Sequence, residues 1–301
     1  MEATGLGAPT PKRSVGRRLA DLFHGRPRLQ VGGLLAGPVG WLVIGYLGSL
    51  AVLLAASFWS LGELSGEVQQ TFTLDNFDTI FTDSVYRSIT LRTILIAALV
   101  TLTDALLALP LAFFMAKVAR PRSKGLLVVA VLVPLWSSYL VKVYAWRTIL
   151  SEDGIFNWAL DPLGLSGPGY GNVAVWLVMS YIWLPYMIIP VYAGLERIPN
   201  SVLAASDDLG AKPWRTFRRV IWPLVFPAIV AGSIFTFSLT LGDYITPGIV
   251  GGKSQFIGNV VYANVGVANN LPLASAFAIV PVIVMIVYLL VARRLGAFRS
   301  L

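Results

Sequence analysis

The stretch SDDLGAKPWRTFRRVIWPLVFP, residues 206–227, lies between two apolar segments that are each long enough to cross a membrane as a helix. It concentrates charge in a chain in which 56% of the residues are hydrophobic and 13% are charged. Gly210 suits the end of one helix, and Pro213 suits the first turn of the next. The stretch therefore predicts two short helices joined at a glycine. Its charge fits either a basic hairpin that anchors a loop at the membrane surface or an element that binds another protein.

The composition of the whole chain predicts an integral membrane protein. The mean hydropathy is +0.73 over 301 residues, and several apolar runs reach the roughly 20 residues that a spanning helix needs. These runs are too long for barrel strands, which alternate over about 10 residues. The chain has no cysteine, which excludes disulfides and thiolate metal sites, and its one histidine, His24, lies in a polar tail. We therefore expect no catalytic residue, no metal site and no bound cofactor.

The apolar pattern predicts an all-α fold with six transmembrane helices, at about 37–60, 88–117, 125–150, 172–195, 223–246 and 273–295. Residues 1–36 are predicted to form a basic cytoplasmic tail and residues 37–301 the transmembrane domain. An uncleaved tail fits better than a signal peptide, because the apolar core starts late and extends past signal length.

The distribution of Lys and Arg predicts the orientation. Six lie in the tail, four at 117–124, five at 196–222 and three after the last helix, which leaves five of the 23 elsewhere. This bias predicts that both termini are cytoplasmic. The net charge of +8 is then mostly a topology signal with some attraction to anionic lipid, and it does not indicate nucleic acid.

The predicted outer loops have a different character. Residues 61–86 and 151–171 contain acidic side chains and no Lys or Arg, and residues 247–272 contain a short apolar piece typical of a re-entrant or interfacial helix. The segment GIVGGKS, 248–254, ends like a phosphate-binding loop, but Pro247 stands where that motif needs its first glycine. The sequence contains no other ATPase motif, so any ATP hydrolysis must occur on a partner.

The quoted stretch resembles the cytoplasmic "EAA" loop of ABC-importer permeases, in which E-A-A-x-x-L-G-A is followed by Phe and by two prolines. The matching residues are Ala205, Leu209, Gly210, Ala211, Phe217, Val220, Pro223 and Pro227. The sequence departs from the pattern at two positions, since Ala204 replaces the usual Glu and Ser206 replaces an Ala.

Two further stretches resemble the spermidine/putrescine branch of these permeases. VPLWSSYLVKVYAWRTIL, 133–150, is similar to the signature of the third helix, and LGDYITPGIVGGKSQFIGN, 241–259, is similar to the segment that follows the fifth. The resemblance covers roughly residues 37–297. Permeases that move opines, amino-acid derivatives, iron or other small solutes share parts of it.

This resemblance implies the type I ABC-importer permease fold, multi-pass in the bacterial inner membrane. It implies four kinds of partner: a second permease subunit (homologous or identical), two ATPase subunits that bind ATP and Mg²⁺, an extracytoplasmic solute-binding protein, and membrane lipid. The loop at 196–222 would couple the permease to the ATPase. The residues implied in coupling are Ala204, Ala205, Ser206, Asp207, Asp208, Leu209, Gly210, Ala211 and Phe217.

Five residues are candidates for a substrate path. Asp104 lies halfway through the second span, where a carboxylate is costly and faces protein or water; it would contact a cation or bond a neighbouring helix with help from Thr101 or Thr103. Asp243 and Tyr244 lie near the outer end of the fifth span, where a carboxylate is also common at a boundary. Trp136 and Tyr139 would line the path through cation–π contact or simply pack. Lys142 is predicted to extend to the membrane surface or to pair with an acid.

Two other classes of function stay open on the residues alone. An ion-driven secondary transporter could use Asp104 as a proton or sodium site, although such folds usually carry internal repeats and we find no repeat. A membrane-embedded enzyme would need clustered reactive groups, which the sequence does not offer.

Overall fold

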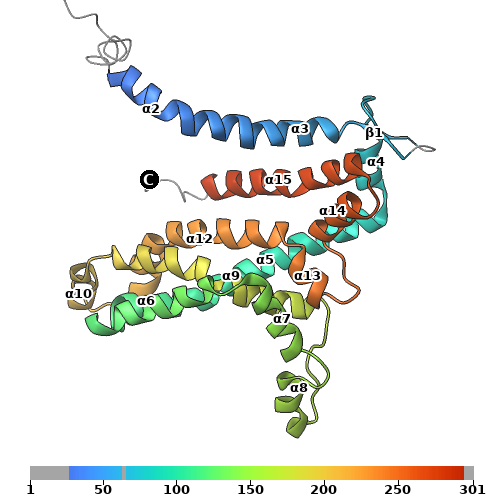
Figure 1. Cartoon of the computed structure of the whole chain (residues 1–301). Helices are drawn as coiled ribbons and strands as arrows, with labels where there is room; N and C mark the ends of the chain where they lie inside the picture. The colour runs from blue at the N-terminus through green and yellow to red at the C-terminus, as the bar shows by residue number, and fades with distance from the viewer. Residues whose placement is uncertain (1–26, 63–65, 295–301) are drawn as a thin grey trace, which may run out of the picture. The chain divides into compact units, whose positions relative to one another are not determined.

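The computed structural model describes residues 27–62 and 66–294, and helices dominate this part of the chain (Figure 1). The chain divides into two compact units, residues 1–55 and 56–301, which are described separately below. Most of the predicted basic tail, residues 1–26, lies outside the described residues.

The first unit is a single apolar helix that corresponds to the predicted first span. It consists of α2 (Pro27–Trp41), the π-helix η1 (Leu42–Leu47) and α3 (Gly48–Ala56). Leu34, Trp41 and Ile44 are all strongly exposed. A helix that is apolar on every side needs lipid or another chain around it.

The core of the second unit is built from three long helices that pack against one another. They are α5 (Ser84–Phe113) with its π-helical continuation η2 (Phe114–Val118), α9 (Asn172–Glu196) and α12 (Trp222–Gly242). Ala108 of α5, Met187 of α9 and Val225 of α12 belong to one buried cluster. A Cβ added at Gly232 of α12 would lie 2.7 Å from the sulfur of Met187, so the glycine allows α9 and α12 to pack closely.

The third predicted span is broken, so the expectation of one continuous helix over 125–150 is wrong. It consists of α6 (Pro121–Trp136) and α7 (Tyr139–Ile149), which meet at 90°. Between them Ser137 has an extended backbone, and Ser138, with φ −56° and ψ 132°, is also non-helical. The hydroxyl of Ser137 donates to the carbonyl of Pro134 at 2.9 Å. Such a local bond stabilises an end of α6 at the expense of the next helical turn.

The remaining elements surround this core. α15 (Leu271–Arg294) is the last span, and it packs against α14 (Ile257–Gly266) and α4 (Asp75–Thr82). β1 (Ser60–Leu61) pairs antiparallel with β2 (Val68–Gln69). The other short helices are α8 (Ile155–Leu160), η3 (Asp161–Leu163), α10 (Asn200–Asp208), α11 (Pro213–Thr216), η4 (Phe217–Ile221) and α13 (Ile245–Val250).

Within the described residues, five helices are long and apolar enough to cross a membrane, and the bent α6–α7 pair makes six if it counts as one span. The all-α prediction with about six spans is confirmed. Two details of the span prediction differ from the structure. The fifth span ends at Gly242, before the predicted 246, because the chain turns at Asp243 to start α13. The predicted single re-entrant piece at 247–272 is two helices, α13 and α14.

Candidate functional site

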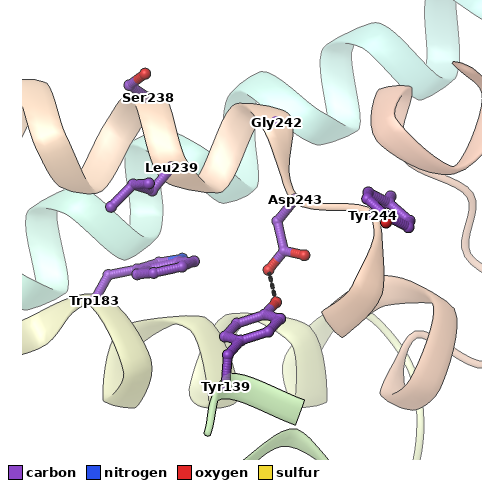
Figure 2. A pocket seen from close by; sticks show the side chains of 7 residues that line it. All are labelled: Tyr139, Trp183, Ser238, Leu239, Gly242, Asp243 and Tyr244. Carbon is purple, nitrogen blue, oxygen red and sulfur yellow. Dashed lines mark hydrogen bonds between the residues drawn. The ribbon is translucent and has the colours of Figure 1, made fainter. Parts of the chain in front are cut away.

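A hollow of about 320 Å³ lies where the break in the third span meets the end of the fifth (Figure 2). Its wall combines the start of α7, the middle of α9, the last turn of α12 and the link between α12 and α13. The lining residues are Tyr139, Trp183, Ser238, Leu239, Gly242, Asp243 and Tyr244.

Asp243 is held by three hydrogen bonds at the centre of this wall. One carboxylate oxygen accepts from the backbone N–H groups of Ile245 at 2.9 Å and Thr246 at 3.1 Å, which caps the start of α13. The other oxygen accepts from the phenol of Tyr139 at 2.5 Å, as Figure 2 shows. The oxygen of the same phenol lies 2.6 Å from the hydroxyl of Thr246. The carboxylate thus joins three chain segments and has a fixed orientation.

Two aromatic rings form the wall beside the carboxylate. Tyr139 and Trp183 are stacked, with ring centres 5.8 Å apart and an interplanar angle of 16°. On the other side Tyr244, which is partly exposed, stacks on Tyr262 of α14 at 4.9 Å. The hollow therefore offers aromatic surface next to one negative charge.

Lys142, near the start of α7, does not place its positive charge in the lining of the hollow. Its ammonium donates to the carbonyl of Pro134 at 3.0 Å. That carbonyl belongs to the last turn of α6, where the helix dipole favours a cation. Lys142 therefore caps the break through this bond, which differs from both expected roles, extension to the membrane surface and pairing with an acid. The residues that line the hollow include no Lys or Arg.

Of the five predicted path residues, the structure brings three together in this hollow: Tyr139, Asp243 and Tyr244. Trp136, the last residue of α6, is 83% exposed and is not part of the wall. Asp104 is fully buried in α5 and does not line the hollow. A role in the path for these two residues stays a prediction.

Among the described residues, Asp104 does not make the hydrogen bond to a neighbouring helix that we considered as its structural role. Both of its carboxylate oxygens are buried without a hydrogen-bond partner among the described residues. The neighbouring hydroxyls bond elsewhere: Thr103 accepts from the indole of Trp176 at 3.0 Å, and Thr101 donates to a carbonyl of its own helix at 2.7 Å.

Sequence reasoning missed part of the wall, most notably Trp183. Its neighbours Ser238 and Leu239 were also not predicted. A second hollow of about 410 Å³, lined mostly by apolar residues, shares Gly242 and Tyr244 with the first and extends along α14 and α15. Among the described residues no group of three or more His, Cys, Asp and Glu side chains is placed to hold a metal ion.

The predicted coupling loop folds as two helices around a glycine, as expected. α10 ends at Asp208, Gly210 has φ +70°, and α11 starts at Pro213 and continues through η4 into α12. We call residues 200–216 the coupling hairpin. Inside it the buried hydroxyls of Ser206 and Thr216 lie 2.8 Å apart. The serine that departs from the family pattern therefore fastens the two helices to each other.

Most side chains on the outer face of the coupling hairpin are exposed. Leu209 is 88% exposed and Trp214 is 69% exposed. Ala204, Ala205, Asp207 and Asp208 are also exposed, whereas Phe217 is partly buried against the core and stacks on Trp214 at 5.6 Å. Exposed apolar groups flanked by charge are typical of a surface that binds another protein.

Comparison with known proteins agrees with this architecture. Residues 91–298 match the model of the family described as "Binding-protein-dependent transport system inner membrane component". The chain is 43% identical to "Inner membrane ABC transporter permease protein YdcU" of Escherichia coli (strain K12), over 97% of this chain and 98% of that protein. It is 33% identical to "Spermidine/putrescine transport system permease protein PotB" of the same organism, over 84% of this chain and 93% of that protein.

Among solved structures, the fold is similar to a chain of the bacterial alginate ABC transporter in complex with an alginate pentasaccharide-bound periplasmic protein. The TM-score is 0.71 at 18% identity, with 92% of this chain and 98% of that chain covered. At that identity the likeness concerns the fold.

Proposed function

The chain belongs to the family of inner membrane components of binding-protein-dependent transport systems, and from this premise we propose that it forms the path for a small cationic solute, a polyamine of the spermidine/putrescine class. Its general role is the permease of an ABC importer, with the type I permease fold and several spans in the bacterial inner membrane. It is a transport subunit and not an enzyme.

The observation that carries the substrate proposal is the Asp243 hollow. A carboxylate stands beside the stacked rings of Tyr139 and Trp183 in a wall without Lys or Arg. A desolvated ammonium over such rings gains about 2 kcal/mol, in addition to its attraction to the carboxylate. Both features favour a cation.

A relative supports the same substrate class. The protein named as a spermidine/putrescine permease is 33% identical over most of its length. Alkyl segments between ammonium groups would suit the apolar hollow that shares Gly242 and Tyr244 with the first. The two hollows together therefore suit a chain that alternates charge and hydrocarbon.

The coupling hairpin is the proposed binding surface for an ATPase subunit. Exposed Leu209 and Trp214 would enter an apolar groove on that partner, and exposed Asp207 and Asp208 would meet its charges at the rim. Because Ala204 replaces the usual Glu, binding to the ATPase would depend on these two apolar side chains and on the two aspartates. In the assembly, two ATPase subunits bind ATP and Mg²⁺, and this chain binds no cofactor.

The other partners in the proposal follow from the path. A second permease subunit, homologous or identical, would complete the path, and a solute-binding protein would dock on the outer loops. ATP binding would close the ATPase pair, move the coupling hairpins together and switch the path to face outward. Membrane lipid surrounds the remaining apolar faces.

The test of the substrate proposal is spermidine and putrescine uptake by the reconstituted complex carrying Asp243→Asn. The asparagine oxygen still accepts from the backbone N–H groups of Ile245 and Thr246, so the cap of α13 is kept while the charge is removed. We expect the apparent affinity for the polyamine to fall by about tenfold or more, since hydrogen bonds to charged groups contribute roughly 1.5–3 kcal/mol.

The control is Arg122→Gln, which also removes a charge, from an exposed position in α6 that lies outside the hollow and outside the outer loops. Uptake by that variant should match the unaltered chain. Unchanged uptake by Asp243→Asn would remove this carboxylate from the path. Uptake of an opine or an iron complex in place of a polyamine would replace the substrate class but keep the permease role.

A further inference from the structure

The cytoplasmic end of α5 is joined to the start of the coupling hairpin by one side chain. Lys117, in the last turn of η2, donates from its ammonium to the carbonyl of Ile198 at 2.5 Å. The same ammonium lies 3.4 Å from the side-chain oxygen of Asn200, the first residue of α10. Lys117 thus contacts both residues that flank Pro199.

The position of this ammonium follows from the end of α9. That helix ends at Glu196, and its last turn leaves carbonyl groups without partners in the helix. Ile198 is buried, so its carbonyl needs a donor from the protein. A cation is the favoured donor at the C-terminal end of a helix.

A second lysine, Lys124, also links the end of η2 to the end of α9. Lys124, in the first turns of α6, donates to the carbonyl of Ala116 at 2.7 Å. Its ammonium also lies 3.9 Å from the carboxylate of Glu196. The two lysines therefore cross-link three segments: the end of η2, the start of α6 and the corner between α9 and α10.

The α10 half of the coupling hairpin is held less firmly than the α11 half, which continues through η4 into α12. The inner hydroxyl pair, Ser206 and Thr216, ties the hairpin to itself, and most other side chains of α10 are exposed. Leu203 packs on the core cluster. Lys117 adds a directional, charged bond to this apolar contact.

We propose that Lys117 is the positioning residue that transmits displacement of the coupling hairpin to α5. This inference rests on the proposed docking of an ATPase on that hairpin. α5 packs extensively against α9 and α12, and these two helices form the Trp183 and Asp243 sides of the hollow. A pull on α10 through Lys117 therefore reaches the helices that line the path.

The test uses the complete complex, with both permeases, the ATPase and the loaded binding protein, in proteoliposomes. Lys117→Met keeps a long unbranched side chain and removes the donor, whereas Lys117→Arg keeps a donor. We expect Lys117→Met to lower the solute transported per ATP hydrolysed by about fivefold or more, a usual size for coupling between sites. The amount of bound ATPase stays unchanged, the melting temperature falls because the buried carbonyl of Ile198 loses its donor, and Lys117→Arg restores the ratio.

Arg122→Met is the matched control, because it removes an exposed cation from the first turn of α6, outside both the coupling hairpin and the outer loops. Asn200→Ala provides a milder second variant that keeps the bond to Ile198, and its ratio should fall in the same direction. The inference is overturned if transport per ATP is unchanged in both Lys117→Met and Asn200→Ala, or if Lys117→Met releases the ATPase. An unaltered chain that retains no ATPase would instead contradict the proposed function.

Discussion

The phenol of Tyr139 donates a hydrogen bond to the carboxylate of Asp243 and so ties the first residue of α7 to the residue that follows α12. The two residues are 104 positions apart in the chain. Each stands at an interruption of a membrane helix, and such interruptions are where transport proteins commonly build their binding sites. The bond therefore joins two irregular segments into one wall.

Tyr139→Phe tests the strength of this link. The phenylalanine keeps the stack on Trp183 but leaves Asp243 without its side-chain donor. Since a hydrogen bond to a charged group contributes about 1.5–3 kcal/mol, we expect a lower melting temperature of the purified permease and weaker polyamine uptake. Tyr144→Phe is the control, because Tyr144 is exposed on the same helix and should change neither quantity. An unaltered melting temperature in Tyr139→Phe would contradict the role of this bond.

Trp183→Leu tests the aromatic wall separately from the charge. A leucine fills much of the space but has no ring face for an ammonium, so we expect polyamine uptake to lose affinity by roughly 2- to 30-fold, which corresponds to about 0.5–2 kcal/mol. Trp183→Phe should recover part of the loss. The comparison variant is Trp136→Leu, which changes an exposed tryptophan outside the wall. If Trp136→Leu proves the more harmful, the path runs past α6 instead.

The spans were predictable from the sequence because hydropathy depends on composition along a single segment. The break between α6 and α7 was not, since its cause lies in side-chain bonds: Ser137 and Lys142 both donate to the carbonyl of Pro134. A serine pair within an apolar run is ordinary in membrane helices. Which carbonyl those donors reach is decided only in three dimensions.

The site was predictable to the extent that motifs mark it. Tyr139, Asp243 and Tyr244 lie in the two stretches that resemble polyamine permeases, and they do line the hollow. Trp183 lies outside those stretches in a run of other large side chains. Its place in the wall follows from packing of α7 against α9, which no local pattern records.

Ser206 and Thr216 make a prediction about the coupling hairpin. Ser206→Ala leaves the buried hydroxyl of Thr216 without its partner, at a cost of about 1–3 kcal/mol, whereas replacing both partners with apolar groups is nearly neutral. We therefore expect trypsin to cleave near Arg215 faster in Ser206→Ala than in the double variant Ser206→Ala with Thr216→Val. If the double variant is cleaved faster than either single variant, the hydrogen bond between these hydroxyls does not hold the two helices of the hairpin together.

Gly210 separates α10 from α11 with a left-handed backbone. An alanine there carries a penalty of about 1–2 kcal/mol, while asparagine tolerates this conformation better. We expect Gly210→Ala to reduce the amount of ATPase that copurifies with the permease, and Gly210→Asn to reduce it less. A Cβ at this position would meet no other atom within 4 Å, so a loss of equal size in both variants would indicate contact with the partner and not backbone strain.

Asp104 provides the last prediction, because its buried carboxylate has no hydrogen-bond partner among the described residues. Its face of α5 also carries Ala97 and Ala108, both fully buried, so an alanine at 104 suits the packing. Removal of an unsatisfied buried polar group is worth about 1–3 kcal/mol, and we expect the melting temperature of Asp104→Ala to rise. Natural chains retain such a costly group where function needs it, so we expect polyamine transport to fall in the same variant. A more stable chain with unaltered transport would remove Asp104 from the path, and a less stable one would show that the carboxylate has a structural partner.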